Sequence, residues 1–227
     1  MTEKVIRQRK RNDIVIRAVI FDLEGVLVDS EQYQFKAWHK LAHEQGLTLD
    51  EKMAQRLIGR SRMDGMRMLL QRANRRYTEA EMLALCMRKS DLFFEAAADM
   101  SAKDLMPGAI ENLEALKKRG IMIAYASSSR NGSYMIKKTG LLPYQDFYQD
   151  ATDIERNKPD PELYRRVAYG LRAAFEDCLV VTDTESGVSA AKRIKMNVLA
   201  LDDAMNDESA DWCAVALDTI NISDLLE

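Results

Sequence analysis

The chain has 227 residues, a formal net charge of −3 at pH 7 and a hydrophobic content of 47%. This length and composition support a buried core, either as one domain or as one domain with a small insertion. The charge argues against nucleic acid or a membrane surface as a partner, and no apolar run is long enough to span a membrane. The N-terminus is polar and basic without the apolar stretch of a signal peptide, and three scattered cysteines fit core residues in a reducing compartment, so we expect a cytoplasmic protein.

The first predicted strand follows a lysine- and arginine-rich segment, residues 1–13, which we predict to be a basic arm outside the fold. Residues 18–21 form a short apolar run with β-branched residues, which predicts a buried parallel strand. Asp22 stands where this strand ends, Glu24 follows two residues later, and Gly25 allows the chain to turn away. Since ligands of open α/β sheets bind at the carboxyl ends of strands, Asp22 and Glu24 are candidates for a nucleophile and a general acid/base. A carboxylate that only caps a turn is the alternative interpretation.

The hydrophobic spacing changes to a helical period from Glu31 onward and keeps it to about residue 101, without a stretch typical of a strand. We therefore predict a small all-helical domain at residues 31–104. It would be inserted after the first strand of an α/β core formed by residues 14–30 and 105–227.

Strand-like and helix-like stretches alternate from residue 105 to the C-terminus. Short apolar runs predict strands at residues 121–126, 146–149, 179–182, 198–201 and 214–217. One of the helices between them is expected to have Asp160 as its N-cap and Pro161 as its first helical residue. This alternation predicts an α/β fold with a Rossmann-like, doubly wound parallel sheet and helices on both faces.

Three polar residues later in the chain are further candidates for the functional site. Ser127 begins a run of hydroxyl residues that leads into a helix, which suits a phosphate cradle made of hydroxyls and backbone N–H groups, or an ordinary capping loop. Lys158 could supply a point charge for phosphate or be a surface lysine. Asp183 directly follows the strand predicted at 179–182.

The stretch 21–30, Phe-Asp-Leu-Glu-Gly-Val-Leu-Val-Asp-Ser, resembles the first motif of the haloacid dehalogenase-like (HAD) superfamily, which is usually Asp-x-Asp-Gly-Val-x-x-Asp-Ser/Thr. Ser127, Lys158 and Asp183 follow in the order of the other three motifs, and the helical insertion lies where one HAD subgroup carries a helical cap. Within that subgroup the chain looks most similar to the β-phosphoglucomutase family, over nearly its whole length. The similar segments are 33–38, 59–62, 88–91 and 126–132, the last with the sequence Ala-Ser-Ser-Ser-Arg-Asn-Gly.

The resemblance implies phosphoryl transfer on a sugar phosphate. In that scheme Asp22 attacks the phosphoryl group and becomes a phospho-aspartate, and Glu24 is the general acid/base. Ser127 and Lys158 hold the transferring group. Mg²⁺ would be held by Asp22, Asp183 and the backbone carbonyl of Glu24, since oxygen-only ligands beside a phosphate suit this ion.

The resemblance also implies which residues bind the rest of the substrate. They are Arg62, Lys89, Ser129, Arg130, Asn131, Gln34 and Trp38. Arg62 and the loop residues 129–131 would hold the distal phosphate, and Lys89 would come from the cap. The family is usually monomeric, so we expect a monomer whose partner is a small sugar phosphate.

Three residues depart from the family pattern within the chemistry. Glu24 replaces an aspartate and places the carboxyl one methylene further out, and Gln34 replaces a histidine. Thr182 replaces the acidic residue before Asp183, which predicts weaker Mg²⁺ binding because divalent-cation affinity follows ligand charge.

Three functions therefore stay open. One is a mutase that interconverts β-glucose 1-phosphate and glucose 6-phosphate, which is favoured by the loop 127–131 because its additional polar residues would serve a second phosphate. The others are a sugar-phosphate phosphatase and a weakly active or inactive phosphosugar-binding homologue, which are favoured by the three departures.

Overall fold

The computed structural model describes residues 15–57 and 62–226. The basic arm expected at 1–13 and the cap-loop positions 59–61 lie outside the described residues. The chain divides into two compact units: a helical unit, residues 30–101, and an α/β unit that comprises the rest. We describe each unit by itself.

The limits of the helical unit differ slightly from the predicted range 31–104. The 3-10 helix Ala102–Asp104 groups with the α/β unit. There the Asp104 carbonyl accepts a hydrogen bond from the Asp29 N–H at 2.8 Å, so this short helix is tied to the end of the first motif.

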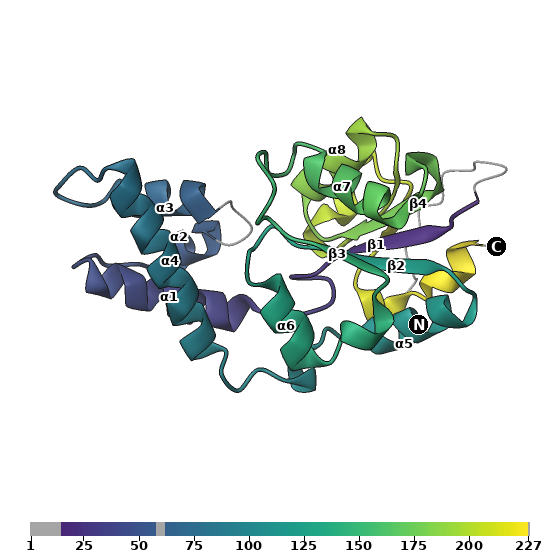
Figure 1. Cartoon of the computed structure of the whole chain (residues 1–227), viewed down its shortest axis with the longest axis horizontal. Coiled ribbons are helices and arrows are strands. Elements are labelled where there is room, and N and C mark those ends of the chain that lie inside the picture. The colour runs from purple at the N-terminus through teal and green to yellow at the C-terminus, as the bar shows by residue number, and fades with distance from the viewer. Residues whose placement is uncertain (1–14, 58–61, 227) are drawn as a thin grey trace. The chain divides into compact units, whose positions relative to one another are not determined.

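The α/β unit is built on a parallel six-stranded sheet with the strand order β3-β2-β1-β4-β5-β6 (Figure 1). This is the order of a doubly wound Rossmann-type sheet, so the predicted fold class is confirmed. The strands are β1 Ala18–Asp22, β2 Met122–Ala126, β3 Phe147–Gln149, β4 Cys178–Thr182, β5 Asn197–Leu201 and β6 Trp212–Ala214.

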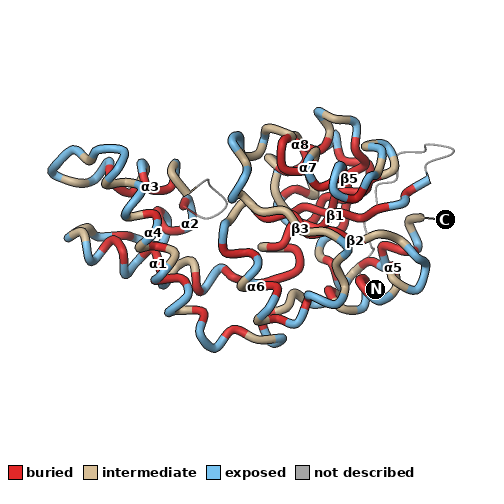
Figure 2. The backbone as a smooth tube through the Cα atoms, viewed as in Figure 1, coloured by how far each residue is buried: buried red, intermediate tan, exposed pale blue. Residues whose placement is uncertain are grey.

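Helices cover both faces of this sheet, which explains why the central strands are apolar throughout. Ala18 and Ile20 of β1 pack with α7 Glu162–Leu171 and α8 Glu185–Arg193 in one hydrophobic cluster. On the other side of the sheet lie α5 Ala109–Lys118 and α6 Gly132–Thr139 (Figure 1). Figure 2 shows β1 buried along its length, and all five of its residues are buried.

Among the differences in the limits of predicted elements, those of the last strand and of helix α7 have a physical reason. The last strand was predicted at 214–217, but β6 ends at Ala214 and a 3-10 helix covers Leu217–Thr219. The apolar residues after Ala214 therefore belong to a turn, whose Val215 carbonyl accepts a hydrogen bond from the Asp202 N–H at 3.2 Å. Helix α7 begins at Glu162 and not at Pro161, which takes the N-cap position without a side-chain cap bond.

The α/β unit also contains several short 3-10 helices. They lie at Ala102–Asp104, Leu142–Tyr144, Phe175–Asp177, Asp202–Asn206, Leu217–Thr219 and Ile222–Leu226. Cys86 of the helical unit and Cys178 and Cys213 of the α/β unit are all buried, as predicted for core residues. Within the described ranges, no helix combines the length and the apolar character needed to cross a membrane.

The helical unit contains α1 Glu31–Glu44, α2 Glu51–Leu57, α3 Arg62–Leu70 and α4 Glu79–Ala96. Helix α4 begins with a capping box in which the Thr78 hydroxyl accepts from the Glu81 N–H and the Glu81 carboxylate accepts from the Thr78 N–H. Arg88 of α4 bonds Glu44 of α1 at 2.7 Å, which joins the two helices.

Candidate active site

Two of the carboxylates predicted from the sequence, Asp22 and Asp183, lie at the carboxyl ends of neighbouring central strands. β1 and β4 are neighbours, and the strand order reverses between them. Asp22 is the last residue of β1 and Thr182 is the last residue of β4, with Asp183 next. This is the topological switch point of the sheet, where ligands of open α/β sheets bind.

Asp22 is buried and accepts three side-chain hydrogen bonds. Lys158 Nζ donates to Oδ2 at 2.5 Å, Thr182 Oγ1 donates to Oδ2 at 2.7 Å, and the Tyr164 hydroxyl donates to Oδ1 at 2.8 Å. The side chains of Asp22 and Lys158 are only 5% and 9% exposed. A buried carboxylate needs such partners, because an unpaired one would cost several kcal/mol in solvation. These three bonds hold the Asp22 carboxylate in a fixed orientation.

Lys158 is the cation of this pair. Burial disfavours the charged form of its amine, yet the adjacent Asp22 carboxylate outweighs burial and raises the pKa of Lys158 above its usual value. Lys158 therefore remains an ammonium at neutral pH. Lys158 and Asp22 therefore form a buried ion pair.

Glu24 lies on the other side of β1 from Thr182 and bonds to the loop after β2. Ser127 Oγ lies 3.0 Å from both carboxylate oxygens of Glu24. Burial, with a smaller contribution from the Asp22 charge, raises the pKa of Glu24 to about 7. A carboxyl with this pKa can both give and accept a proton near neutral pH, as a general acid/base requires.

The loop 127–131 is held in shape by its own side chains. Ser127 Oγ accepts from the Ser129 N–H at 3.0 Å, and Ser129 Oγ accepts from the Asn131 N–H at 3.1 Å. Asn131 is buried and precedes helix α6, whereas Arg130 is exposed. The loop thus presents hydroxyls, an exposed guanidinium and a helix N-terminus at the same strand end, a combination that suits a phosphate group.

Two of the expected metal ligands, Asp22 and Asp183, lie close enough for their charges to interact. Gly25 has φ +77°, and a Cβ there would come within 2.0 Å of Asp183 Oδ2, so Asp183 lies directly against the backbone that follows Glu24. Burial and the nearby Asp22 charge raise the pKa of Asp183 to about 6. Two carboxylates beside a backbone carbonyl are the hard oxygen donors that Mg²⁺ prefers. No cluster of three or more His, Cys, Asp or Glu side chains that could hold a metal exists in the described ranges, so these two carboxylates would need the backbone carbonyl as a third protein ligand.

Four of the predicted substrate-binding residues belong to the helical unit, and three of them lie together. Lys89 is buried, and its Nζ donates to Gln34 Oε1. The ammonium lies 5.0 Å from the centre of the Trp38 ring, in the range of a cation–π contact. Arg62 Nη2 donates to Ser90 Oγ at 2.9 Å, one residue beyond Lys89. Gln34, at a histidine position of the family, thus serves as an uncharged acceptor for Lys89.

Two hydroxyls on Asp22 were missed by the sequence analysis. Thr182 was noted only as a lost charge, and Tyr164 was not considered at all. Tyr164 lies among the buried positions of α7, which are otherwise mostly apolar. A buried tyrosine almost always pairs its hydroxyl, so this one polar atom on an apolar helix face was the available clue.

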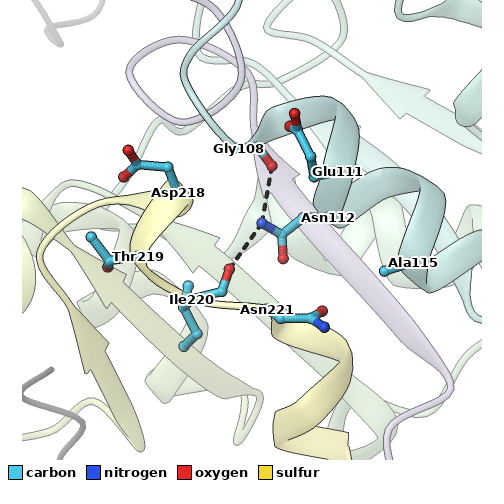
Figure 3. Close-up of a pocket in the computed structure, with 8 residues that line it drawn as sticks. All are labelled: Gly108, Glu111, Asn112, Ala115, Asp218, Thr219, Ile220 and Asn221. Atoms are coloured by element: carbon cyan, nitrogen blue, oxygen red, sulfur yellow. Dashed lines mark hydrogen bonds between the residues drawn. The ribbon is translucent and has the colours of Figure 1, made fainter.

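A hollow of about 450 Å³ lies beside α5 and shares no residue with the Asp22 site (Figure 3). Carboxylates of Glu111 and Asp218 line it, and no lysine or arginine is among the lining residues, so it does not suit a phosphate. Asn112 Nδ2 there donates to the carbonyls of Gly108 and Ile220 at 2.9 and 3.1 Å. These bonds fasten the C-terminal segment to α5, which is a structural role.

Comparisons with known proteins agree with this geometry. A family model described as haloacid dehalogenase-like hydrolase matches residues 16–195. The β-phosphoglucomutase of Bacillus subtilis (strain 168) is 35% identical, over 80% of this chain and 81% of that protein. The phosphorylated carbohydrates phosphatase of Thermotoga maritima is 30% identical, over 78% of this chain and 81% of that protein. The crystal structure of β-phosphoglucomutase from Clostridium difficile has a TM-score of 0.86 at 28% identity, and the alignment covers 93% of this chain and 96% of that chain.

Proposed function

The chain belongs to the haloacid dehalogenase-like hydrolase family, and on that premise we propose that it transfers phosphoryl groups of a sugar phosphate through Asp22. The proposed reaction is the interconversion of β-glucose 1-phosphate and glucose 6-phosphate. The relatives described above include a β-phosphoglucomutase and a phosphatase of phosphorylated carbohydrates, which supports the substrate class.

The observation that carries this proposal is the buried Asp22–Lys158 pair at the switch point of the sheet. Asp22 would attack the phosphorus while the bond from phosphorus to the sugar oxygen breaks. Lys158 and Ser127 would bind the oxygens of the transferring group. Phosphoryl transfer depends mainly on positioning and on neutralisation of charge, which this set of residues can provide.

Glu24 would manage the proton. Its pKa of about 7 leaves a large protonated fraction at neutral pH, so it could protonate the departing sugar oxygen. In the transfer back from phospho-Asp22, the same carboxylate would accept the proton of the attacking hydroxyl of a sugar monophosphate, which forms the sugar bisphosphate. Attack of Asp22 on the other phosphate of this bisphosphate would then yield the isomeric monophosphate. Since Ser127 bonds both Glu24 oxygens in this structure, Glu24 must leave Ser127 before it can reach the sugar.

Asp22, Asp183 and the Glu24 carbonyl would hold Mg²⁺, because the Asp183 carboxylate lies against the Gly25 backbone and near the Asp22 charge, and such oxygen donors fit a hard cation. A bound Mg²⁺ would neutralise the phosphoryl oxygens. With Thr182 in place of an acidic residue, we propose that the ion is bound less tightly than in relatives with a further carboxylate.

The second candidate is a sugar-phosphate phosphatase. It is favoured by the Glu24–Ser127 contact, because a carboxyl beside the phosphate-binding hydroxyl could activate water against a phospho-aspartate. The similarity to the Thermotoga maritima phosphatase supports it as well.

The experiment that separates these functions is ³¹P NMR of the protein with Mg²⁺, β-glucose 1-phosphate and a catalytic amount of glucose 1,6-bisphosphate. Growth of a glucose 6-phosphate signal without inorganic phosphate would support the mutase. Growth of inorganic phosphate would support the phosphatase. If neither signal grows, a panel of other sugar phosphates would distinguish a different sugar from a protein that binds phosphosugars without turnover.

A further inference from the structure

We propose that Tyr164 and Thr182 are positioning residues that together fix the Asp22 carboxylate for attack on phosphorus. Neither belongs to the functional residues that the four motifs imply. The inference rests on the proposed function, because it assigns a task to these hydroxyls within phosphoryl transfer at Asp22.

The two hydroxyls bond different oxygens of one carboxylate. Tyr164, from α7, donates to Oδ1 at 2.8 Å, and Thr182, from the end of β4, donates to Oδ2 at 2.7 Å. Tyr164 and Thr182 are both fully buried, at 0% exposure. Rotation of the carboxylate would break both bonds at once, so the pair defines the plane in which the nucleophilic oxygens lie.

The proton of Tyr164 is directed at Asp22 by the group behind it. Lys158 Nζ lies 3.2 Å from the Tyr164 hydroxyl oxygen. An ammonium has only donors, so the hydroxyl accepts from Lys158 and must give its own single proton elsewhere. The remaining partner within hydrogen-bonding distance is Asp22 Oδ1.

The proton of Thr182 is directed in the same way. Asp22 Oδ2 is a carboxylate oxygen and can only accept, so the Thr182 hydroxyl gives its proton to it at 2.7 Å, and the Thr184 hydroxyl is a more distant neighbour at 3.3 Å. The Thr184 N–H donates to Thr182 Oγ1 at 3.3 Å. Gly187 leaves the space for this arrangement, since a Cβ at that position would come within 2.1 Å of Thr182 Oγ1.

These neutral donors matter because Lys158 has a second task. In the proposed reaction Lys158 must bind the oxygens of the transferring phosphoryl group, which weakens its hold on Asp22. Tyr164 and Thr182 can keep the carboxylate oriented while Lys158 shifts, and they do so without cancelling its negative charge. A loss of orientation on the order of 1 Å can cost about a hundredfold in rate.

The test compares variants that remove a hydroxyl with matched variants that do not affect Asp22. Tyr164→Phe and Thr182→Val each remove one hydroxyl at nearly constant shape. Tyr125→Phe is the control for a buried tyrosine, because its hydroxyl donates to the Leu141 carbonyl at 3.1 Å on the other face of the sheet. Thr182→Ser keeps the hydroxyl.

Two readouts are measured: kcat and KM for the sugar phosphate, and the affinity for fluoroberyllate with Mg²⁺ present, by ¹⁹F NMR. We expect Tyr164→Phe and Thr182→Val to lower kcat by about 10- to 100-fold with little change in KM, and to weaken fluoroberyllate binding about tenfold. Thr182→Ser should recover most of the loss, and Tyr125→Phe should match the wild type.

The failures are distinguishable. If the wild type turns over sugar phosphates but Tyr164→Phe behaves like Tyr125→Phe in both readouts, the positioning role is refuted and the proposed function stands. If the two hydroxyl variants raise KM and leave kcat unchanged, they act in substrate binding and the inference is also refuted. If the wild type neither turns over any sugar phosphate nor binds fluoroberyllate, the proposed function itself fails, and the inference fails with it.

Discussion

Asp22 and Glu24 lie at and just after the end of β1, and their carboxyl groups have different hydrogen-bond partners on the two sides of that strand. On the β4 side, Asp22 accepts bonds from an ammonium and two hydroxyls, which fix the orientation of its carboxylate. On the β2 side, Glu24 meets the Ser127 hydroxyl, and burial raises its pKa to about 7. The number and kind of donors, rather than the residue type, thus suit one carboxyl for attack on phosphorus and the other for proton transfer.

Asp22→Asn tests the proposed role of Asp22 as the nucleophile and should have the largest effect. An amide is a poor nucleophile, so we expect turnover to fall by a factor of at least about a thousand, measured by coupled steady-state assay. The matched control is Asp211→Asn, which alters another buried aspartate that pairs with Lys192 at 2.6 Å, and which should retain activity. Equal activity of Asp22→Asn and the wild type would show that Asp22 is not the nucleophile.

Glu24→Gln tests the other side of β1. It keeps the shape and the contact with Ser127 but cannot exchange a proton, so sugar turnover should fall by about 100- to 10,000-fold. Phosphorylation of Asp22 by a small donor with a good leaving group needs no proton and should survive, as measured by rapid quench. Equal loss in both assays would show that Glu24 has a structural role instead.

The free energy of unfolding, measured in EDTA, should depend on pH with a definite sign, and this effect is smaller than the losses of activity. Glu24 and Asp183 have pKa values of about 7 and about 6 in the folded protein, above their ordinary values of 4.5 and 3.8. The folded state therefore binds these protons more tightly than the unfolded state, and the free energy of unfolding should decrease as pH rises from about 4 through 7. In urea titrations, Glu24→Gln should lessen the decrease between pH 5 and pH 8 by on the order of 2 kcal/mol. A decrease as steep as that of the wild type would contradict the raised pKa of Glu24.

The smallest expected effect concerns the exposed end of the loop after β2. Arg130→Ala should raise KM for sugar phosphates by about tenfold and leave KM for simple phosphate esters unchanged. In the proposed function Arg130 binds the distal phosphate of the sugar substrate, which a simple ester lacks. Lys137→Ala, an exposed cation on the following helix, is the control and should change neither constant. An equal effect of both variants would indicate long-range electrostatic attraction rather than a binding contact.

The parts of the site that lie on strands were predictable from the sequence, and the parts that depend on rotamers were not. Parallel strands end at one edge, so Asp22, Ser127 and Asp183 had to lie near one another once the strands were identified. The rotation of α7 about its axis, which brings Tyr164 to Asp22, could not be predicted from the residue pattern. The additional methylene of Glu24 was expected to displace its carboxyl, yet its contact with Ser127 could be found only from three-dimensional coordinates.

The turn at Gly25 has a consequence for how this protein tolerates mutation. Its φ of +77° disfavours any side chain, and a Cβ would collide with the Asp183 carboxylate. In a saturation-mutagenesis screen for activity, residue 25 should therefore accept no amino acid other than glycine. A position without a side chain would then be as intolerant of substitution as the proposed nucleophile, because any Cβ there would occupy the space that the Asp183 carboxylate needs.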